Sequence, residues 1–311
     1  MIKKLTLALF VSLLVVVVSK AAVPDLPAQR SETIVLASLD VVQALGEALT
    51  EQTSIRVLNA IPQGYSMQGQ RAYLKKHQDI FSQLAEHAAG VLSVTSAWSD
   101  DPLYQWARRA NIRIVNIDVT KPLDGYGAGV PLLQVEGAYS PYVWRSPANL
   151  TRMAVIAADD LSRLVPHEAQ TIEENLKKLQ SALFQLRSRY ENAFTQMELV
   201  DLAALTGDYT YLMDEFGLGI RFYTLKPEGQ WTADEEQALS QHLSQSGIVG
   251  VICPWEPEEK GRQVIRKGGA VPIVLKKYVS SLGVDPVTSL VRWYDDNLSQ
   301  LLGALKTTTG G

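Results

Sequence analysis

Short apolar runs alternate with amphipathic segments along the first half of the chain. Buried β-strands are predicted at Thr33–Ser38, Ser54–Leu58, Gly90–Val94 and Ile112–Ile117. The intervening segments, including one from Gln70 to Glu86, carry apolar residues every three to four positions, which is the helical period. Strands that alternate with helices are typical of a parallel sheet covered by helices. The first half of the chain therefore predicts a small α/β lobe.

The second half of the chain repeats this alternation and predicts a second small parallel sheet. Its predicted strands are Leu199–Leu205, Ile220–Leu225, Gly247–Cys253 and Val271–Leu275. A C-terminal helix is predicted over 286–306, with leucines recurring on one face.

One long helix is predicted between the two halves. No Gly or Pro occurs from His167 to Phe194, and apolar residues recur there every three to four positions. About 27 residues at about 1.5 Å each make a helix of roughly 40 Å, more than twice the usual length. The predicted fold class is α/β, with two α/β lobes that contain small parallel sheets and are joined by one long rigid helix. The predicted parts are an N-terminal lobe (22–165), the linking helix (166–194) and a C-terminal lobe (195–311).

The first 21 residues predict a cleaved secretory signal peptide. Lys3 and Lys4 precede an apolar run from Leu5 to Val18, and Ser19 and Ala21 fit the small-residue positions of a cleavage site. The run is short for a membrane span of about 20 residues, although an uncleaved anchor helix is the alternative. The mature protein is expected in the periplasm.

Charge and cysteine content exclude several classes of function. The chain has 29 Lys and Arg against 33 Asp and Glu, and loss of three lysines with the signal peptide makes it more acidic still. This balance argues against nucleic acid as a partner. The single cysteine, Cys253, excludes an intramolecular disulfide, a cysteine-rich zinc site and an iron–sulfur cluster. No motif for a catalytic triad, a Cys–His pair or paired carboxylates is present, so an enzyme is not expected.

The segment Ser140-Pro-Tyr-Val-Trp-Arg-Ser-Pro147 resembles the Asp-Pro-His-x-Trp-x-x-Pro signature of the periplasmic zinc and manganese solute-binding proteins of ABC transporters. The segment from Tyr211 to Leu218 is similar to that family's Tyr-Leu-x-x-x-Tyr-Gly-Leu motif. The resemblance covers almost all of the mature chain. It implies the two-lobed fold with a long helix, a binding function without catalysis, and an inner-membrane ABC permease as partner.

The resemblance also implies where metal ligands should stand, and this chain has other residues there. The family binds its metal with histidines and carboxylates drawn from both lobes, as transition metals prefer. The corresponding positions here are Met67, Tyr142, Thr206 and Lys276. Lys276 places a positive charge where a carboxylate is expected. No free metal ion and no cofactor is therefore predicted at this site.

An organic or chelated-metal ligand, for example of siderophore type, is the hypothesis that follows. Aromatic walls with a few polar or cationic groups suit such a ligand. The predicted ligand-binding cleft consists of Tyr65, Met67, Tyr142, Thr206 and Lys276. Its possible walls are Trp98, Trp144, Tyr209, Trp255 and Tyr278. Lys277 or Arg145 are further cations for an anionic ligand.

Three alternatives remain open from the sequence. In the first, Tyr142 only fills the space that the missing imidazole leaves, and Trp144 is a core residue rather than a ligand contact. A filled cleft would make the chain a non-cargo accessory protein that docks to the transporter or to a second binding protein. The third alternative is a zinc or manganese carrier with atypical ligands such as Met67 and Tyr142.

Overall fold

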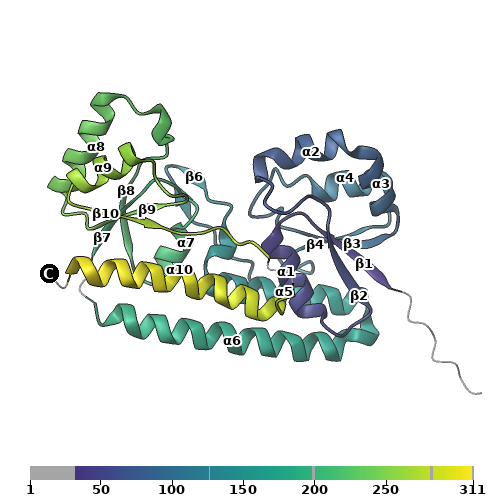
Figure 1. Ribbon diagram of the computed structural model, residues 1–311. Coiled ribbons are helices and arrows are strands. Elements are labelled where there is room, and N and C mark those ends of the chain that lie inside the picture. Colours follow the sequence, from purple (N-terminus) through teal and green to yellow (C-terminus); the bar gives the residue numbers. More distant parts are fainter. Residues whose placement is uncertain (1–31, 126, 198–199, 281–282, 310–311) are drawn as a thin grey trace, which may run out of the picture. The chain divides into compact units, whose positions relative to one another are not determined.

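Two parallel four-stranded sheets organise the computed structural model, which describes residues 32–309 except 126, 198–199 and 281–282. The predicted signal peptide therefore lies outside the described residues. Figure 1 shows the two sheets, each covered by helices. This arrangement confirms the predicted fold class. Among the described residues, no helix is both long enough and apolar enough to cross a membrane.

The N-terminal sheet has the strand order β2-β1-β3-β4, and every pairing is parallel. Its strands are β1 (Thr33–Ala37), β2 (Ile55–Asn59), β3 (Ala88–Ser93) and β4 (Val115–Asp118). The inner strand β1 ends in three fully buried residues, Val35, Leu36 and Ala37. Its continuous apolar run is what a strand with both faces covered requires.

The C-terminal sheet has the strand order β10-β9-β7-β8 and is also parallel throughout. Its strands are β7 (Asp201–Ala204), β8 (Gly219–Tyr223), β9 (Gly250–Cys253) and β10 (Val271–Val274). A short antiparallel hairpin, β5 (Gln134–Val135) with β6 (Ala138–Tyr139), lies between the two sheets in the sequence. In parallel sheets the carboxyl ends of the strands are the usual ligand-binding edge.

Helices cover these sheets and connect them. The α-helices are α1 (Asp40–Thr50), α2 (Gln70–Lys76), α3 (Gln78–Glu86), α4 (Leu103–Ala110), α5 (Pro147–Leu164), α6 (Ala169–Thr195), α7 (Thr210–Glu215), α8 (Ala233–Gln245), α9 (Glu259–Lys267) and α10 (Pro286–Thr309). The short 3-10 helices are η1 (Met67–Gly69), η2 (Val143–Arg145), η3 (Pro166–Glu168) and η4 (Glu228–Gln230).

The stretch from Gln70 to Glu86 is helical as predicted, but it is divided at His77 into two helices. His77 has φ −113° and ψ 31°, so α2 ends there and α3 begins at the next residue. The imidazole packs 4.4 Å from the ring of Tyr73. No Gly or Pro marks this break, and the hydrophobic period continues through it, so the sequence gives no local signal for two helices.

Two long helices, rather than α6 alone, connect the N-terminal and C-terminal sheets. The 27-residue helix α6 packs against α1 and α5. The 24-residue helix α10 packs against α6 and α1 and also against β10 of the C-terminal sheet. Figure 1 shows α10 running along α6. The lobes thus share a support made of two helices.

A buried carboxylate, Glu215 at the end of α7, fixes the beginning of α5 against α6. Its side chain is 6% exposed and forms an ion pair with Arg187 of α6. It also accepts hydrogen bonds from the hydroxyl of Ser146 and the backbone N–H of Ala148. Ser146 in turn accepts from the N–H of Asn149 and so caps α5. These contacts set the position of the segment that precedes α5, residues 140–147.

Replacement of Glu215 by Ala should destabilise the fold by about 2 kcal/mol or more, because it removes the buried one of two carboxylates that pair with Arg187 and the acceptor of two donors at the start of α5. The free energy of unfolding from urea titrations measures this loss. Glu191→Ala is the matched control, since Glu191 pairs with the same Arg187 from an exposed position. The control should lose less than about 1 kcal/mol. Equal losses in the two variants would contradict the role given to Glu215.

Candidate functional site

The segment 140–147 forms a turn that its neighbours hold on both sides. The carbonyl of Ser140 accepts a hydrogen bond of 2.9 Å from the hydroxyl of Tyr211 in α7. Trp144 is buried within η2, and its carbonyl accepts from the hydroxyl of Tyr294 in α10. Trp144 is therefore a packing residue beneath the turn, and Tyr142 is the aromatic side chain that this turn presents.

Tyr142 lies where the two lobes meet. Its half-buried ring packs edge-on at 5.8 Å from the ring of Trp144. Burial is the main cause that raises the pKa of this phenol, and the negative charge of Asp208 raises it further. A hydrogen bond with the side chain of Gln68, which belongs to the N-terminal lobe, lowers the pKa of the Tyr142 phenol. The neutral phenol of Tyr142 therefore interacts with Gln68 of the N-terminal lobe and with Asp208 of the C-terminal lobe.

Tyr142, Gln68, Thr206 and Asp208 form what we call the Tyr142 contact. Thr206 and Asp208 are its C-terminal side. Thr206 is buried two residues after the end of β7, and its hydroxyl donates to Asp208 Oδ1 at 2.7 Å. The N–H of Asp208 donates back to the same hydroxyl at 3.1 Å. Thr206 therefore orients the carboxylate that acts on Tyr142. Met67 is buried next to Gln68 on the N-terminal side, in the same hydrophobic core against which Tyr142 packs.

Arg145 is a buried cation close to this contact. The residue is 3% exposed, and its guanidinium lies 4.2 Å above the ring of Tyr209 and 5.3 Å from the ring of Trp293. Its Nη1 donates to the carbonyl of Lys276 at 3.3 Å. Its buried Nε has no hydrogen-bond partner, and no carboxylate of the described residues forms an ion pair with it. Aromatic faces and one carbonyl stabilise a charge that usually needs a counter-ion.

Lys276 contributes its backbone, not its ammonium group, to the surroundings of Arg145. Its carbonyl also accepts from Trp293 Nε1 at 2.8 Å and from Asn297 Nδ2 at 3.1 Å. Its N–H donates to Asn297 Oδ1 at 2.7 Å. The exposed side chain instead lines a cavity with Trp255, on the side of the C-terminal lobe. The structure thus brings Tyr142 and Thr206 together through Asp208 and places the charge of Lys276 in a different cavity.

The predicted wall residues divide into core and surface residues. Tyr209 is buried and donates to the carbonyl of Leu275 at 2.6 Å, and burial raises the pKa of its phenol to about 12. Tyr278 is buried 5.6 Å from the ring of Trp293 and shares a 3.0 Å hydrogen bond with Ser289. Trp98 is half-buried, whereas Tyr65 and Trp255 are exposed. Tyr65 packs 5.1 Å from Tyr73 within its own lobe.

Sequence reasoning omitted Asp208 from the site and gave Arg145 only a supporting role. Asp208 stands two residues beyond Thr206, and the Thr-Gly-Asp order after a strand is the signal that could have indicated it. Nothing local distinguishes Arg145 from a surface arginine, because its burial depends on α7 and α10.

The His, Cys, Asp and Glu side chains of the described residues are not gathered into a metal centre. No group of three or more His, Cys, Asp or Glu side chains among them is arranged to hold a metal ion. His77 and His242 pack against the rings of Tyr73 and Phe222. Cys253 is buried, and burial raises the pKa of its thiol to about 12, so it stays protonated at neutral pH.

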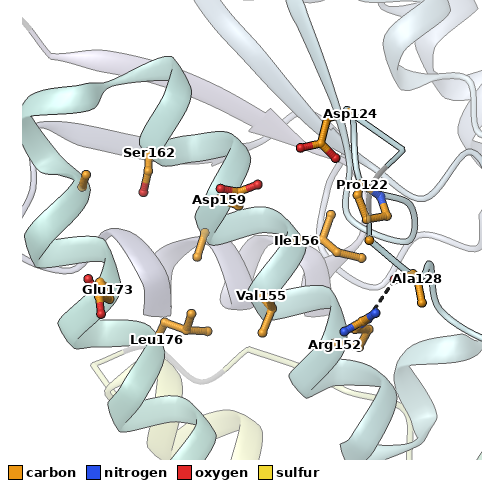
Figure 2. Close-up of a pocket in the computed structure, with 13 residues that line it drawn as sticks. Pro122, Asp124, Ala128, Arg152, Val155, Ile156, Asp159, Ser162, Glu173 and Leu176 are labelled. Atoms are coloured by element: carbon orange, nitrogen blue, oxygen red, sulfur yellow. Dashed lines mark hydrogen bonds between the residues drawn. The ribbon is translucent and has the colours of Figure 1, made fainter.

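A separate cavity of about 600 Å³ lies between α5, the start of α6 and the residues Pro122, Asp124, Gly127 and Ala128. Figure 2 shows its walls, including the Arg152 side chain that donates to the carbonyl of Ala128 at 2.8 Å. Its acidic side chains have cationic partners: Arg163 pairs with Asp124 and Asp159, and Lys177 pairs with Glu173. This cavity contains none of the predicted site residues, and its carboxylates lie beside cationic side chains.

Comparison with known proteins identifies the kind of protein that has this fold. The family model described as "Zinc-uptake complex component A periplasmic" (ZnuA) matches residues 28–304. A search of the curated proteins finds no match.

Several solved structures share the fold at low sequence identity. A mutant of FpvC from Pseudomonas aeruginosa is 18% identical, covers 88% of this chain and 99% of its own, and has a TM-score of 0.72. FpvC in complex with Mn²⁺ is 16% identical with coverages of 89% and 99% and a TM-score of 0.70. The Zn(II)-bound ZnuA-like domain of Streptococcus pneumoniae AdcA is 16% identical with coverages of 90% and 100% and a TM-score of 0.68. At these identities the likeness establishes the fold alone.

Ionisation of Tyr209 should destabilise the protein at alkaline pH. Its folded-state pKa of about 12 lies above the value of about 10 expected in the unfolded chain. The contribution of the neutral Tyr209 phenol to the free energy of unfolding is therefore complete below pH ~10 and is lost as the pH rises towards ~12. Between pH 8 and pH ~11.5, the free energy of unfolding from urea titrations should fall by about 2 kcal/mol more in the wild type than in Tyr209→Phe, whose remaining loss comes from other groups with raised pKa values such as Tyr190 and Cys253.

The exposed Tyr139 provides the control for this experiment. Tyr139→Phe should retain the wild-type alkaline loss. A Tyr209→Phe variant with the same alkaline loss as wild type would contradict the assigned environment of Tyr209.

Proposed function

This chain belongs to the family of periplasmic zinc-uptake components, the solute-binding proteins of ABC metal transporters, and we propose that its own cargo is an organic or chelated-metal ligand rather than a free metal ion. We propose that this ligand binds between the lobes, at the Tyr142 contact. An inner-membrane ABC permease then receives it.

The buried positive charge of Arg145 is the observation that carries this proposal. Its guanidinium is close enough to Tyr142 to lower the pKa of that phenol against the effect of burial. This charge would repel a divalent cation placed at Tyr142, whereas the half-buried carboxylate of Asp208, whose effect on the Tyr142 phenol is the larger of the two, would attract one. Arg145 would attract an anionic ligand or an anionic metal chelate.

The donor atoms at the contact support the same proposal. Tyr142 offers a neutral phenol, the Thr206 hydroxyl is already bonded to Asp208, and Met67 offers a thioether. Zinc and manganese sites in proteins are built from imidazoles, thiolates and carboxylates. Neutral hydroxyl groups and aromatic faces are better suited to hydrogen-bond and pack against an organic molecule.

A second candidate function follows from the way in which Tyr142 fills the contact. Its ring and its polar contacts with Gln68 and Asp208 occupy the place where the lobes meet. A cleft closed by its own side chains would favour an accessory protein without cargo, docked to the transporter or to a second binding protein. Arg145 favours the cargo function. Burying a cation without an ion-pair partner costs free energy, and an anionic ligand would offset this cost.

Native mass spectrometry of the protein purified from the periplasm should separate these functions. We expect an added mass of a small anion or ferric chelate, released on denaturation, on a chain that begins at Ala22 after cleavage of the predicted signal peptide. Arg145→Met should reduce retention at least about tenfold, because a charged partner of the ligand is lost. Arg266→Met, an exposed arginine of α9, is the matched control.

The folded state of Arg145→Met must be verified by circular dichroism before its result is interpreted. If the wild type retains no added mass, and if its tryptophan fluorescence does not respond to ferric chelates or small anions, the accessory function replaces the cargo function.

A further inference from the structure

A groove on the C-terminal lobe lies apart from the Tyr142 contact. It is a cavity of about 630 Å³ between the segments that follow β9 and β10 and one face of α10. Trp255 stands two residues after β9, and Lys276 two residues after β10. The groove therefore opens at the carboxyl edge of a parallel sheet, where α/β proteins commonly bind ligands. Its volume is within the range of small-molecule sites.

Three cationic side chains line this groove without ion-pair partners. Lys276, Lys277 and Arg292 are all exposed, and no carboxylate among the described residues pairs with any of them. Two acids share the lining, but Glu256 is already paired with Arg262 at 2.9 Å. Only Asp296 offsets the three cations, so the groove has a net positive charge. The acidic cavity of Figure 2 differs, because its carboxylates have their own partners.

The groove also exposes apolar surface that is held in place. Trp255 is 43% exposed, and its Nε1 donates to Glu228 Oε1 at 3.3 Å, which limits the positions of the indole. Trp293 is buried and fixed by its hydrogen bond to the carbonyl of Lys276. Val279 and Val284 complete the apolar lining. The exposed indole of Trp255 offers a flat surface for an aromatic or similarly flat group, and the buried Trp293 supports the groove from beneath.

A polar extension continues the groove along α10. A second cavity of about 690 Å³ shares Glu256, Val274, Lys276, Asp296 and Asn297 with the first, and adds Pro272, Ser299 and Gln300. The shared residues mean that the two cavities are neighbours on one surface. An elongated ligand could therefore place its apolar part near Trp255 and polar groups beside α10.

We propose that this α10 groove binds a small amphipathic organic anion. Its flat apolar part packs against Trp255, and its carboxylate or comparable acid group lies among Lys276, Lys277 and Arg292. Charge attraction and aromatic packing together account for the two classes of side chain that line the groove. This site goes beyond the proposed function, because it shares no residue with the contact of Tyr142, Thr206 and Asp208 and does not depend on the cargo bound there.

Titration of the mature protein with 2-naphthoate tests the α10 groove. Indole N–H signals in ¹⁵N-labelled protein, assigned by Trp→Phe variants, should show a saturable shift of the Trp255 signal. The neutral analogue 2-naphthalenemethanol should bind at least about tenfold more weakly, because it lacks the negative charge. Lys276→Gln with Arg292→Gln should weaken 2-naphthoate binding by about tenfold or more, since two exposed charges are lost.

Two variants distinguish this site from nonspecific attraction and from the Tyr142 contact. Arg266→Gln with Lys267→Gln removes the same charge from exposed positions of α9 and should leave the affinity unchanged. Tyr142→Phe should also bind 2-naphthoate as wild type does. The proposal is overturned if Trp255 does not respond, if the α9 variant loses affinity equally, or if Tyr142→Phe abolishes binding.

Discussion

The buried guanidinium of Arg145 is the constraint on which the site depends. Its charge is stabilised by the faces of Tyr209 and Trp293 and by the carbonyl of Lys276, with no carboxylate ion pair among the described residues. This arrangement fixes the backbone of Lys276 and turns its side chain to the α10 groove. It also gives the Tyr142 contact a positive neighbour, at a position where the resemblance to the family predicts a metal ligand. The proposed organic or chelated-metal ligand follows from this positive charge.

The support for this arrangement comes from helices rather than from the sheets. Glu215 joins the start of α5 to α6, while α10 supplies Trp293 and Tyr294 beneath the segment that carries Tyr142 and Arg145. Because α6 and α10 both reach α1, the two lobes share one helical support. The position of Arg145 is therefore coupled to the same contacts that hold the lobes together.

The sequence predicted the elements better than the contacts among them. The helix α6 was predictable because 27 residues lack both Gly and Pro, and the buried strands because their apolar runs are continuous. The break at His77 was not predictable, since nothing local marks it. Tyr142 and Thr206 were selected as cleft residues from the resemblance, which stays a prediction, and Asp208, which acts on Tyr142 and bonds to Thr206, was missed. The burial of Arg145 arises from residues of α7 and α10 that only the folded chain brings near.

Calorimetric titration of zinc and of manganese into the mature wild-type protein tests the central claim most directly. A site that holds a buried cation and lacks imidazole ligands should give no saturable one-to-one binding of either metal. One-to-one binding that Tyr142→Phe or Thr206→Val abolishes would contradict the account, because it would place a free metal ion beside Arg145.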